Sequence, residues 1–260
     1  MLLQHPPSLE DVFLPPPPFG HLPQIPTEVR RNLGEGGWGL RTTTMHRIII
    51  FANGDLPDLE KARALLRPDD FILCADGGTR HALALGVKPN LILGDMDSVG
   101  KEMLKKLQDD GVEIELFPRD KDETDLELAL NKALELNPDE IIIAAALGGR
   151  TDQTLANIAL ISNTQYAIRN IRLDDGVEEI FLCRAQAEVR GRSGDLVSLI
   201  PWGEPVHGVQ TENLKWRLNG ETLYPDKSRG ISNEMTNNIA SIKIKSGLLL
   251  IIHTRQSPIL

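Results

Sequence analysis

From residue 48 onward, short apolar runs alternate with segments that mix apolar and polar residues. The apolar runs are continuous, as in strands that are buried on both faces, and the segments between them are amphipathic. Strands are predicted at 48–52, 71–75, 91–93, 112–116 and 141–147, and helices at 58–66, 79–85, 101–108, 125–136 and 151–161. This alternation predicts a doubly wound α/β domain with a mostly parallel sheet.

Beyond about residue 170 the pattern changes to strands without strong helices between them. Strands are predicted at 177–182, 195–200, 239–245 and 248–252, and Gly, Asp and Asn residues mark the turns. The segment 239–245 alternates apolar and polar residues, which is typical of a half-buried antiparallel strand. We therefore expect an α/β domain over 45–168 and a small antiparallel β-sandwich or partial barrel over 169–260.

Residues 1–44 have a different composition from the rest of the chain. They contain a proline run at 15–18 and glycines at 34, 36, 37 and 39. Such a segment cannot form a packed core, so we expect a disordered extension and a fold that begins at Met45. A docking tail for a proline-recognising partner is the alternative.

Composition and charge limit the kinds of binding partner that the chain can have. The net charge of -9 and the lack of a basic stripe argue against a nucleic-acid partner, although a nucleotide can still bind through a divalent cation. Cys74 and Cys183 lie in apolar runs, as reduced thiols of a cytoplasmic protein do. No apolar run reaches the roughly 18 residues that a membrane helix needs, so no membrane partner is expected.

The loops that follow the predicted strands carry most of the candidate chemistry. They are Asn53-Gly54-Asp55, Asp76-Gly77-Gly78, Gly94-Asp95-Met96-Asp97-Ser98, the segment 119–125 and Gly148-Gly149-Arg150-Thr151-Asp152. In open α/β sheets, ligands bind beyond the carboxyl ends of the strands, where such loops meet. Several polar loops at one edge indicate a site more strongly than any one of them.

Asp95 and Asp97 are two residues apart, so an extended chain would point both carboxylates to one side. Two like charges repel unless a cation lies between them. Mg²⁺ is the natural occupant, because it prefers hard oxygen ligands and phosphates. The alternative is an ordinary solvated turn.

Asp122 and Asp125 lie three residues apart at the start of a predicted helix, which can bring them to the same side. Helix capping by 124–127 is the structural alternative. One of the two aspartates is then free to join Asp95 and Asp97. Lys121 beside them is a candidate for phosphate binding, or an ordinary exposed lysine.

Two glycine pairs each precede a predicted helix, at Gly77 and Gly78 and at Gly148 and Gly149. Glycine lets a phosphate approach the backbone N–H groups at a helix start, although a tight turn requires glycine equally. Arg150 adds a planar donor suited to phosphate oxygens. No Gly-x-x-x-x-Gly-Lys-Ser/Thr loop is present, and no Gly-x-Gly-x-x-Gly follows a strand.

In the C-terminal half, Trp216 stands between charged residues, and the segment 230–234 contains Ser232 and Asn233. A half-exposed tryptophan can stack on a cationic ring. The alternative, which the residues alone favour, is a tryptophan in the sandwich core. His81 and His253 are interpreted as surface or lining residues.

Together these motifs resemble the thiamine pyrophosphokinase (thiamine diphosphokinase) family. The matching segments are Ala75-Asp76-Gly77-Gly78, Gly94-Asp95-Met96-Asp97-Ser98, Lys121-Asp122-Glu123-Thr124-Asp125, Gly148-Gly149-Arg150-Thr151-Asp152, Leu214-Lys215-Trp216 and Ser232-Asn233. The resemblance covers about residue 45 to the C-terminus. It implies a homodimer that transfers a pyrophosphoryl group from ATP to the hydroxyl of thiamine, giving thiamine diphosphate and AMP.

The resemblance also implies roles for individual residues. The catalytic set would be Asp95, Asp97, Asp122, Asp125 and Lys121, with one or both of the last two aspartates joining the first two as Mg²⁺ ligands. The ATP-binding set would be Asp76, Gly77, Gly78, Asp97, Lys121, Gly148, Gly149, Arg150 and Asp152. Trp216, Ser232 and Asn233 would contact thiamine at the subunit interface. Catalysis would then rest on in-line positioning and charge stabilisation.

This chain departs from the family pattern at Gln153, where histidine is usual, and in its N-terminal extension. Glutamine cannot titrate, so proton transfer at this position is in doubt. A non-catalytic nucleotide or thiamine sensor with the same fold is the main alternative, and another nucleotidyl- or phosphotransferase is the next. The intact acidic residues favour an enzyme.

Overall fold

The computed structural model describes residues 47–163 and 170–256. The expected extension over 1–44 and the expected start at Met45 lie outside the described residues. Among the helices described, none is long and apolar enough to cross a membrane.

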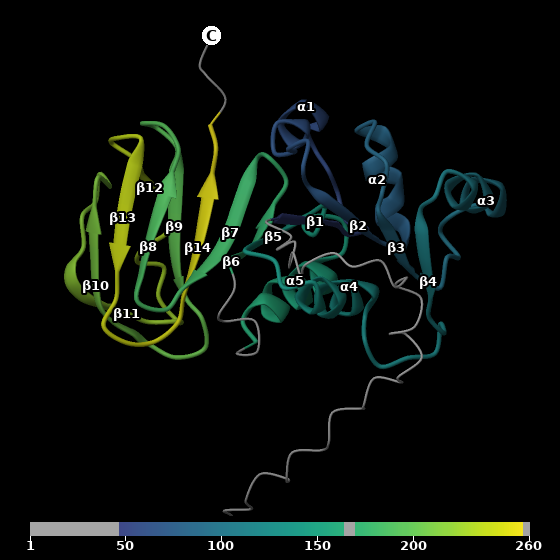
Figure 1. The fold of residues 1–260 in the computed structure, drawn as a ribbon. Helices are drawn as coiled ribbons and strands as arrows, with labels where there is room; N and C mark the ends of the chain where they lie inside the picture. Colours follow the sequence, from purple (N-terminus) through teal and green to yellow (C-terminus); the bar gives the residue numbers. More distant parts are fainter. Residues whose placement is uncertain (1–46, 164–169, 257–260) are drawn as a thin grey trace, which may run out of the picture. The chain divides into compact units, whose positions relative to one another are not determined.

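The first half forms a parallel sheet with helices between the strands, as predicted (Figure 1). Its elements are β1 (Arg47–Phe51), α1 (Leu59–Arg63), β2 (Phe71–Ala75), the 3-10 turn η2 (Asp76–Gly78), α2 (Thr79–Ala84), β3 (Leu91–Gly94), α3 (Lys101–Asp109), β4 (Glu113–Leu116), α4 (Asp125–Glu135), β5 (Glu140–Ala144) and α5 (Thr151–Ile161). Strand β1 pairs in parallel with β2 and β5, and β3 lies between β2 and β4.

Helices cover both faces of this sheet because β1, β2, β3 and β5 are apolar on both sides. One face packs on α1, α2 and α3, through Ala62, Ala82, Leu85 and Leu107. The other packs on α4 and α5, through Leu126, Ala129, Leu130, Ala133, Ile158 and Ile161. Figure 1 shows α1 and α2 on the opposite side of the strands from α4 and α5. The prediction from fully apolar strands is therefore confirmed.

Helix α1 and strand β5 each end three residues before their predicted ends. Helix α1 begins after Asp58, whose carboxylate caps it by accepting from two backbone N–H groups, and it ends at Arg63. Strand β5 ends at Ala144, because Ala145 has a φ of +54° and turns the chain out of the sheet. The carbonyls beyond this turn are then free to bind the loop after β1.

The second half continues the same sheet and adds another. Its strands are β6 (Asn170–Asp174), β7 (Glu178–Cys183), β8 (Gln186–Arg190), β9 (Leu196–Pro201), β10 (Val206–Glu212), β11 (Asn219–Leu223), β12 (Asn233–Glu234), β13 (Ile239–Lys243) and β14 (Leu249–Thr254). The ten-stranded sheet has the order β12-β9-β14-β7-β6-β5-β1-β2-β3-β4, and the four-stranded sheet has the order β11-β10-β13-β8.

The antiparallel sandwich forms between the four-stranded sheet and one end of the ten-stranded sheet. Its core contains Val189, Val209 and Ile242 from the smaller sheet, packed with Leu199 and Ile251 from the larger one. The predicted fold class is confirmed. The domain boundary expected at 168/169 stays a prediction, and the sheet runs across it because β6 pairs in parallel with β5 and antiparallel with β7.

A buried histidine corrects one sequence interpretation. His253 was expected at the surface or lining a site, but it is 0% exposed. Its Nδ1 lies 3.3 Å from Glu179 Oε2 and its Nε2 lies 3.1 Å from Asp195 Oδ2. Burial alone would raise the pKa of Glu179, but the hydrogen bond with His253 and the nearby cations Arg172 and Arg255 lower it to about 2. Pairing with two carboxylates is what permits this polar ring in the core.

Candidate active site

A cavity of about 520 Å³ lies at the carboxyl ends of the parallel strands. The loops after β1, β2, β3 and β5 line it, together with the segment before α4 and the start of that helix. Each polar loop that the sequence analysis placed at this edge contributes at least one residue to the cavity. The prediction that these loops meet at one edge is confirmed.

Three carboxylates cluster in this region. Oxygen atoms of Asp76, Asp95 and Asp97 all lie within 4.8 Å of one another. Asp76 is only 6% exposed, and its Oδ1 has no hydrogen-bond partner among the described residues. Buried carboxylates without donors are costly, and a cation is the group that compensates them. Sequence reasoning treated Asp76 as a nucleotide-binding residue and missed its place in this cluster.

The Asp95–Asp97 segment is a turn, although its two carboxylates do meet. Met96 between them has a φ of +61° and is buried, so the chain is not extended here. Asp97 donates its backbone N–H to Asp95 Oδ1 at 3.1 Å, and Ser98 Oγ donates to Asp97 Oδ1 at 3.1 Å. Arg119 Nη2 lies 3.7 Å from Asp97 Oδ2. The turn interpretation and the paired-carboxylate interpretation therefore describe the same segment.

Asp125 adjoins this cluster through the close approach of both groups to Gly94. A Cβ on Gly94 would lie 2.8 Å from Asp76 Cβ and 3.3 Å from Asp125 Oδ1. Any larger residue at the end of β3 would push these side chains apart. Lys121 Nζ lies 2.9 Å from Asp125 Oδ1 and donates to Pro118 O at 3.2 Å, so a cation stands beside the acidic groups.

Asp122 is not brought into the cluster. It is exposed and does not line the cavity, in contrast to Asp125. The capping interpretation of the neighbouring residues is confirmed, because Thr124 Oγ1 accepts from Glu127 N at 3.2 Å.

The two glycine pairs have different surroundings. Gly77 and Gly78 are buried and do not line the cavity, and a Cβ on Gly78 would lie 2.0 Å from Phe51 O. Gly78 is therefore required for its close approach to β1, and Gly77 lies against Asn53, whose Oδ1 a Cβ would meet at 2.5 Å. Neither glycine has a positive φ, so the dihedral angles of a tight turn are not the reason for this pair. Gly148 and Gly149 both line the cavity, in positive-φ conformations of +76° and +64°.

Arg150 also lines the cavity and forms a double hydrogen bond with Asp152. Its Nε donates to Oδ1 at 3.1 Å and its Nη2 to Oδ2 at 2.5 Å. This hydrogen bond lowers the pKa of Asp152. Asp152 itself does not line the cavity, so the structure places it beside Arg150 rather than in the lining.

The loop after β1 is held from α2 by two residues that sequence reasoning missed as site residues. Arg80 Nη2 donates to the carbonyls of Asn53 and Gly54, at 3.1 and 3.0 Å. His81 Nε2 lies 2.9 Å from Gly54 O. Burial lowers the pKa of His81, so the neutral ring that donates through Nε2–H is favoured. The available signal was a pair of basic residues at the start of the helix after Asp76.

The predicted thiamine-contact residues lie together between β10 and β12. Trp216 is 55% exposed, so its placement in the sandwich core is wrong. Asn233 is buried, accepts from Trp216 N at 3.0 Å and donates to Trp216 O at 2.8 Å. Lys215 Nζ lies 5.1 Å from the centre of the indole ring. Ser232 donates its backbone N–H to Ser198 Oγ at 3.0 Å. The asparagine fixes the backbone that presents the indole.

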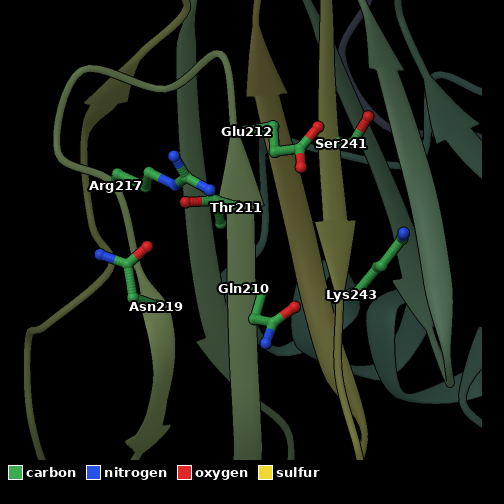
Figure 2. Close-up of a pocket in the computed structure, with 7 residues that line it drawn as sticks. All are labelled: Gln210, Thr211, Glu212, Arg217, Asn219, Ser241 and Lys243. Atoms are coloured by element: carbon green, nitrogen blue, oxygen red, sulfur yellow. The ribbon is translucent and has the colours of Figure 1, made fainter.

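A second, smaller pocket of about 160 Å³ lies on the four-stranded sheet (Figure 2). Arg217, Glu212 and Lys243 are among the side chains around it. None of the predicted site residues lines it, so it is separate from the cavity at the strand ends.

Comparisons with known proteins agree along most of the chain. Residues 62–173 match the family model "Thiamin pyrophosphokinase, catalytic domain", and residues 185–249 match "Thiamin pyrophosphokinase, vitamin B1 binding domain". A thiamine pyrophosphokinase of Bacillus subtilis is 29% identical over 181 residues, covering 69% of this chain and 85% of the relative. Thiamine pyrophosphokinase 1 of Oryza sativa subsp. japonica is 28% identical over 211 residues, covering 70% of this chain and 78% of the relative.

Solved structures give the same result. The crystal structure of the thiamine pyrophosphokinase from Bacillus subtilis superposes with a TM-score of 0.73 at 26% identity, covering 81% of this chain and 100% of that one. The thiamin pyrophosphokinase from Geobacillus thermodenitrificans superposes with a TM-score of 0.69 at 28% identity, covering 82% and 100%. The similarity thus includes both the α/β half and the sandwich.

Proposed function

The chain belongs to the thiamin pyrophosphokinase family, and we propose that it transfers a pyrophosphoryl group from ATP to the hydroxyl of thiamine, forming thiamine diphosphate and AMP. The observation that carries this proposal is the carboxylate cluster of Asp76, Asp95 and Asp97, with Asp125 beside it, at the cavity of the catalytic half. A protein that only sensed thiamine or nucleotide would not need a cluster of like charges that includes the buried carboxylate of Asp76.

Mg²⁺ is the cation that fits the acidic cluster. Its donors are hard carboxylate oxygens, and the unpartnered Oδ1 of Asp76 supplies one that nothing else in the described residues satisfies. Asp76, Asp95 and Asp97 would hold the ion, and Asp125 would stand next to it. When bound, the ion neutralises charge on the phosphate oxygens. We assign no ligand role to Asp122.

The cations around the cavity bind the phosphates. Lys121, Arg119 and Arg150 all line it, as do Gly148 and Gly149. The thiamine hydroxyl loses its proton to a carboxylate of the cavity or to solvent, and its oxygen forms a bond to the β-phosphorus. The bond from that phosphorus to the oxygen bridging to the α-phosphate breaks, and AMP leaves. The protein's contribution is to position these groups in line and to stabilise charge, as is general in phosphoryl transfer. Asp152 holds the guanidinium of Arg150 in place.

Thiamine binding involves Trp216, with Ser232 and Asn233 supporting it. An exposed indole suits a flat, positively charged ring, because the face of an aromatic ring attracts cations. Trp216 does not line the cavity of its own chain, which supports a homodimer in which the indole of one subunit meets the cavity of the other. The buried free thiols of Cys74 and Cys183 support the proposed cytoplasmic location.

The proposal is tested by incubating the purified protein with ATP, Mg²⁺ and thiamine and resolving the products. AMP and thiamine diphosphate should appear in equal amounts. ADP as the product would indicate a different phosphotransferase, and saturable thiamine binding without any turnover would indicate a sensor. Analytical ultracentrifugation with and without thiamine tests the dimer.

A further inference from the structure

The loop Asn53-Gly54-Asp55 after β1 has no role in the reaction proposed above. Asp55 lines the cavity and is exposed to it. Its carboxylate has no hydrogen bond or ion pair with any other residue that the structure describes. A carboxylate without partners in a ligand cavity has both oxygens available to donors from a ligand.

The backbone of this loop is fixed on the β5 side. Gly54 N donates to Ala145 O at 2.7 Å, and Asp55 N donates to Leu147 O at 2.8 Å. A Cβ on Gly54 would lie 2.6 Å from both of these carbonyl oxygens, so only glycine allows this contact. The position of Asp55 is therefore set by the turn at the end of β5.

The same loop is fixed on the α2 side by Arg80 and His81, whose side chains bind the carbonyl of Gly54 at 3.0 and 2.9 Å. Contacts on two sides leave the backbone before Asp55 little freedom. A carboxylate on such a rigid segment is ready for a ligand before the ligand arrives.

The carboxylate of Asp55 lies against the second glycine pair. A Cβ on Gly148 would be 2.5 Å from Asp55 Oδ2, and one on Gly149 would be 4.0 Å from both carboxylate oxygens. Asp55 is not part of the cluster formed by Asp76, Asp95 and Asp97. A carboxylate without a cation repels phosphate, so the part of the nucleotide that meets Asp55 must carry hydrogen-bond donors.

We propose that Asp55 accepts hydrogen bonds from the ribose hydroxyls of the nucleotide, which makes the site selective for ribonucleotides. This inference rests on ATP being the co-substrate. ATP has donors only in its ribose hydroxyls and its adenine amino group. The ribose is next to the phosphates, and two neighbouring hydroxyls match two carboxylate oxygens, as in other nucleotide-binding α/β folds. No aromatic side chain of the described residues lines this cavity to stack a base.

The test compares ATP with 2′-deoxy-ATP and 3′-deoxy-ATP in the wild type, Asp55→Ala and Asp55→Asn. In the wild type, at least one deoxynucleotide should lose roughly tenfold or more in kcat/KM, which is the usual effect of one hydrogen bond to a charged group. Asp55→Ala should use ATP and that deoxynucleotide equally, with the change mainly in KM. Equal use of all three nucleotides by the wild type, or an unchanged preference in Asp55→Ala, would overturn the proposal.

A control variant and a second nucleotide analogue distinguish ribose recognition from base recognition. Glu123 also lines the cavity, so Glu123→Ala is the matched control and should keep the wild-type preference. Purine riboside triphosphate lacks the adenine amino group. If Asp55→Ala instead abolishes discrimination against this analogue, the carboxylate binds the amino group of the base and the proposal is wrong. Calorimetry measures the binding of the same nucleotides without thiamine. Because this binding requires no pyrophosphoryl transfer, it tests the role of Asp55 separately from the proposed reaction. Circular dichroism of Asp55→Ala should match the wild type.

Discussion

At the scale of single residues, the acidic cluster depends on Asp76. This aspartate is buried, has a φ of +40°, and has one oxygen without a hydrogen-bond partner in the described part of the chain. Such a group destabilises the metal-free protein and gains most from a bound cation. The Asp76 side chain should therefore both lower the stability of the metal-free protein and be required for activity.

We predict opposite effects of Asp76→Asn on activity and on stability. Asparagine tolerates the positive φ but removes one ligand charge, so kcat/KM should fall by about 100-fold or more, because several kcal/mol of charge stabilisation is lost. The Tm without Mg²⁺ should stay the same or rise, since repulsion among carboxylates is relieved. A variant with wild-type activity, or a metal-free Tm several degrees lower, would contradict the assigned role. Activity and Tm are measured on the same preparation.

Trp216→Ala should weaken thiamine binding selectively. An indole stacked on a cationic ring contributes about 1 to 2 kcal/mol, so the KM for thiamine should rise roughly tenfold while the KM for ATP changes little. Because Trp216 is 55% exposed, the Tm should hardly move. Trp216→Phe keeps an aromatic ring and should restore part of the affinity. An equal rise in the KM for both substrates, or a large fall in Tm, would indicate that Trp216 has a packing role instead.

Residue spacing revealed only the local part of this site. The pair Asp95 and Asp97 could be predicted because the two residues are neighbours along the chain. Asp76 joins them through the pairing of β2 with β3, which no spacing within the sequence records. Asp55 reaches the glycines at 148 and 149 only through the contact of its loop with the end of β5. The loops that carry these residues could be predicted from the sequence. Which of their residues come into contact through strand pairing could not.

At the scale of elements, the carboxyl end of β3 sets the geometry of the site. Gly94 is the last residue of this strand, has a φ of +141°, and leaves room for the side chains of Asp76 and Asp125. We predict that Gly94→Ala separates these carboxylates and lowers kcat/KM by about tenfold or more, since small displacements of reacting groups are costly. The required concentration of Mg²⁺ should rise in parallel.

Gly100 provides the matched control for this substitution. It precedes α3 with a φ of -61°, and a Cβ there would meet nothing within 4 Å. Gly100→Ala should keep the wild-type activity and requirement for Mg²⁺. Similar losses in the two variants would mean that the effect of Gly94→Ala is not specific to the acidic cluster. Activity is titrated against Mg²⁺ for both variants and the wild type.

The strands that could be predicted were the apolar ones. Strands β1, β2, β3 and β5 have continuous apolar runs. The expected strands at 177–182, 195–200, 239–245 and 248–252 correspond to β7, β9, β13 and β14. Strands β6, β8, β10, β11 and β12 were missed. Strand β11 is mostly polar, β12 has only two residues, and β10 has shifted register with its neighbour β11. Their pairing partners determine these strands more than their own sequences do.

At the scale of the whole described fold, charged side chains connect neighbouring strands across the join between the two halves. Arg172 on β6 donates to Glu179 on β7 at 2.6 Å and is also paired with Glu140 on β5. Glu179 contacts His253 on β14 in turn. The continuous sheet and this row of charges were not predicted, because the change in pattern near residue 170 indicated two separate domains.

Glu179 should therefore control how the stability of the fold depends on pH. Its pKa falls from the usual 4.5 to about 2 in the folded protein. A lowered pKa means that the stabilisation is fully present above about pH 4.5 and is lost as the pH falls toward 2. A shift of this size corresponds to about 3 kcal/mol. Glu179→Gln should thus be less stable than the wild type at pH 7 and approach it as the pH is lowered.

Urea unfolding between pH 7 and pH 3 measures this difference. The surface pair of Glu188 with Arg190 supplies the control, because exposed ion pairs contribute little, about 0 to 1 kcal/mol. Glu188→Gln should follow the wild-type curve at every pH. If the curve of Glu179→Gln runs parallel to the wild type instead of converging, the charge of Glu179 is not what stabilises the join between β6, β7 and β14. Convergence of the two stability curves on acidification would show that the ionised carboxylate of Glu179 stabilises the join between the two halves of the sheet.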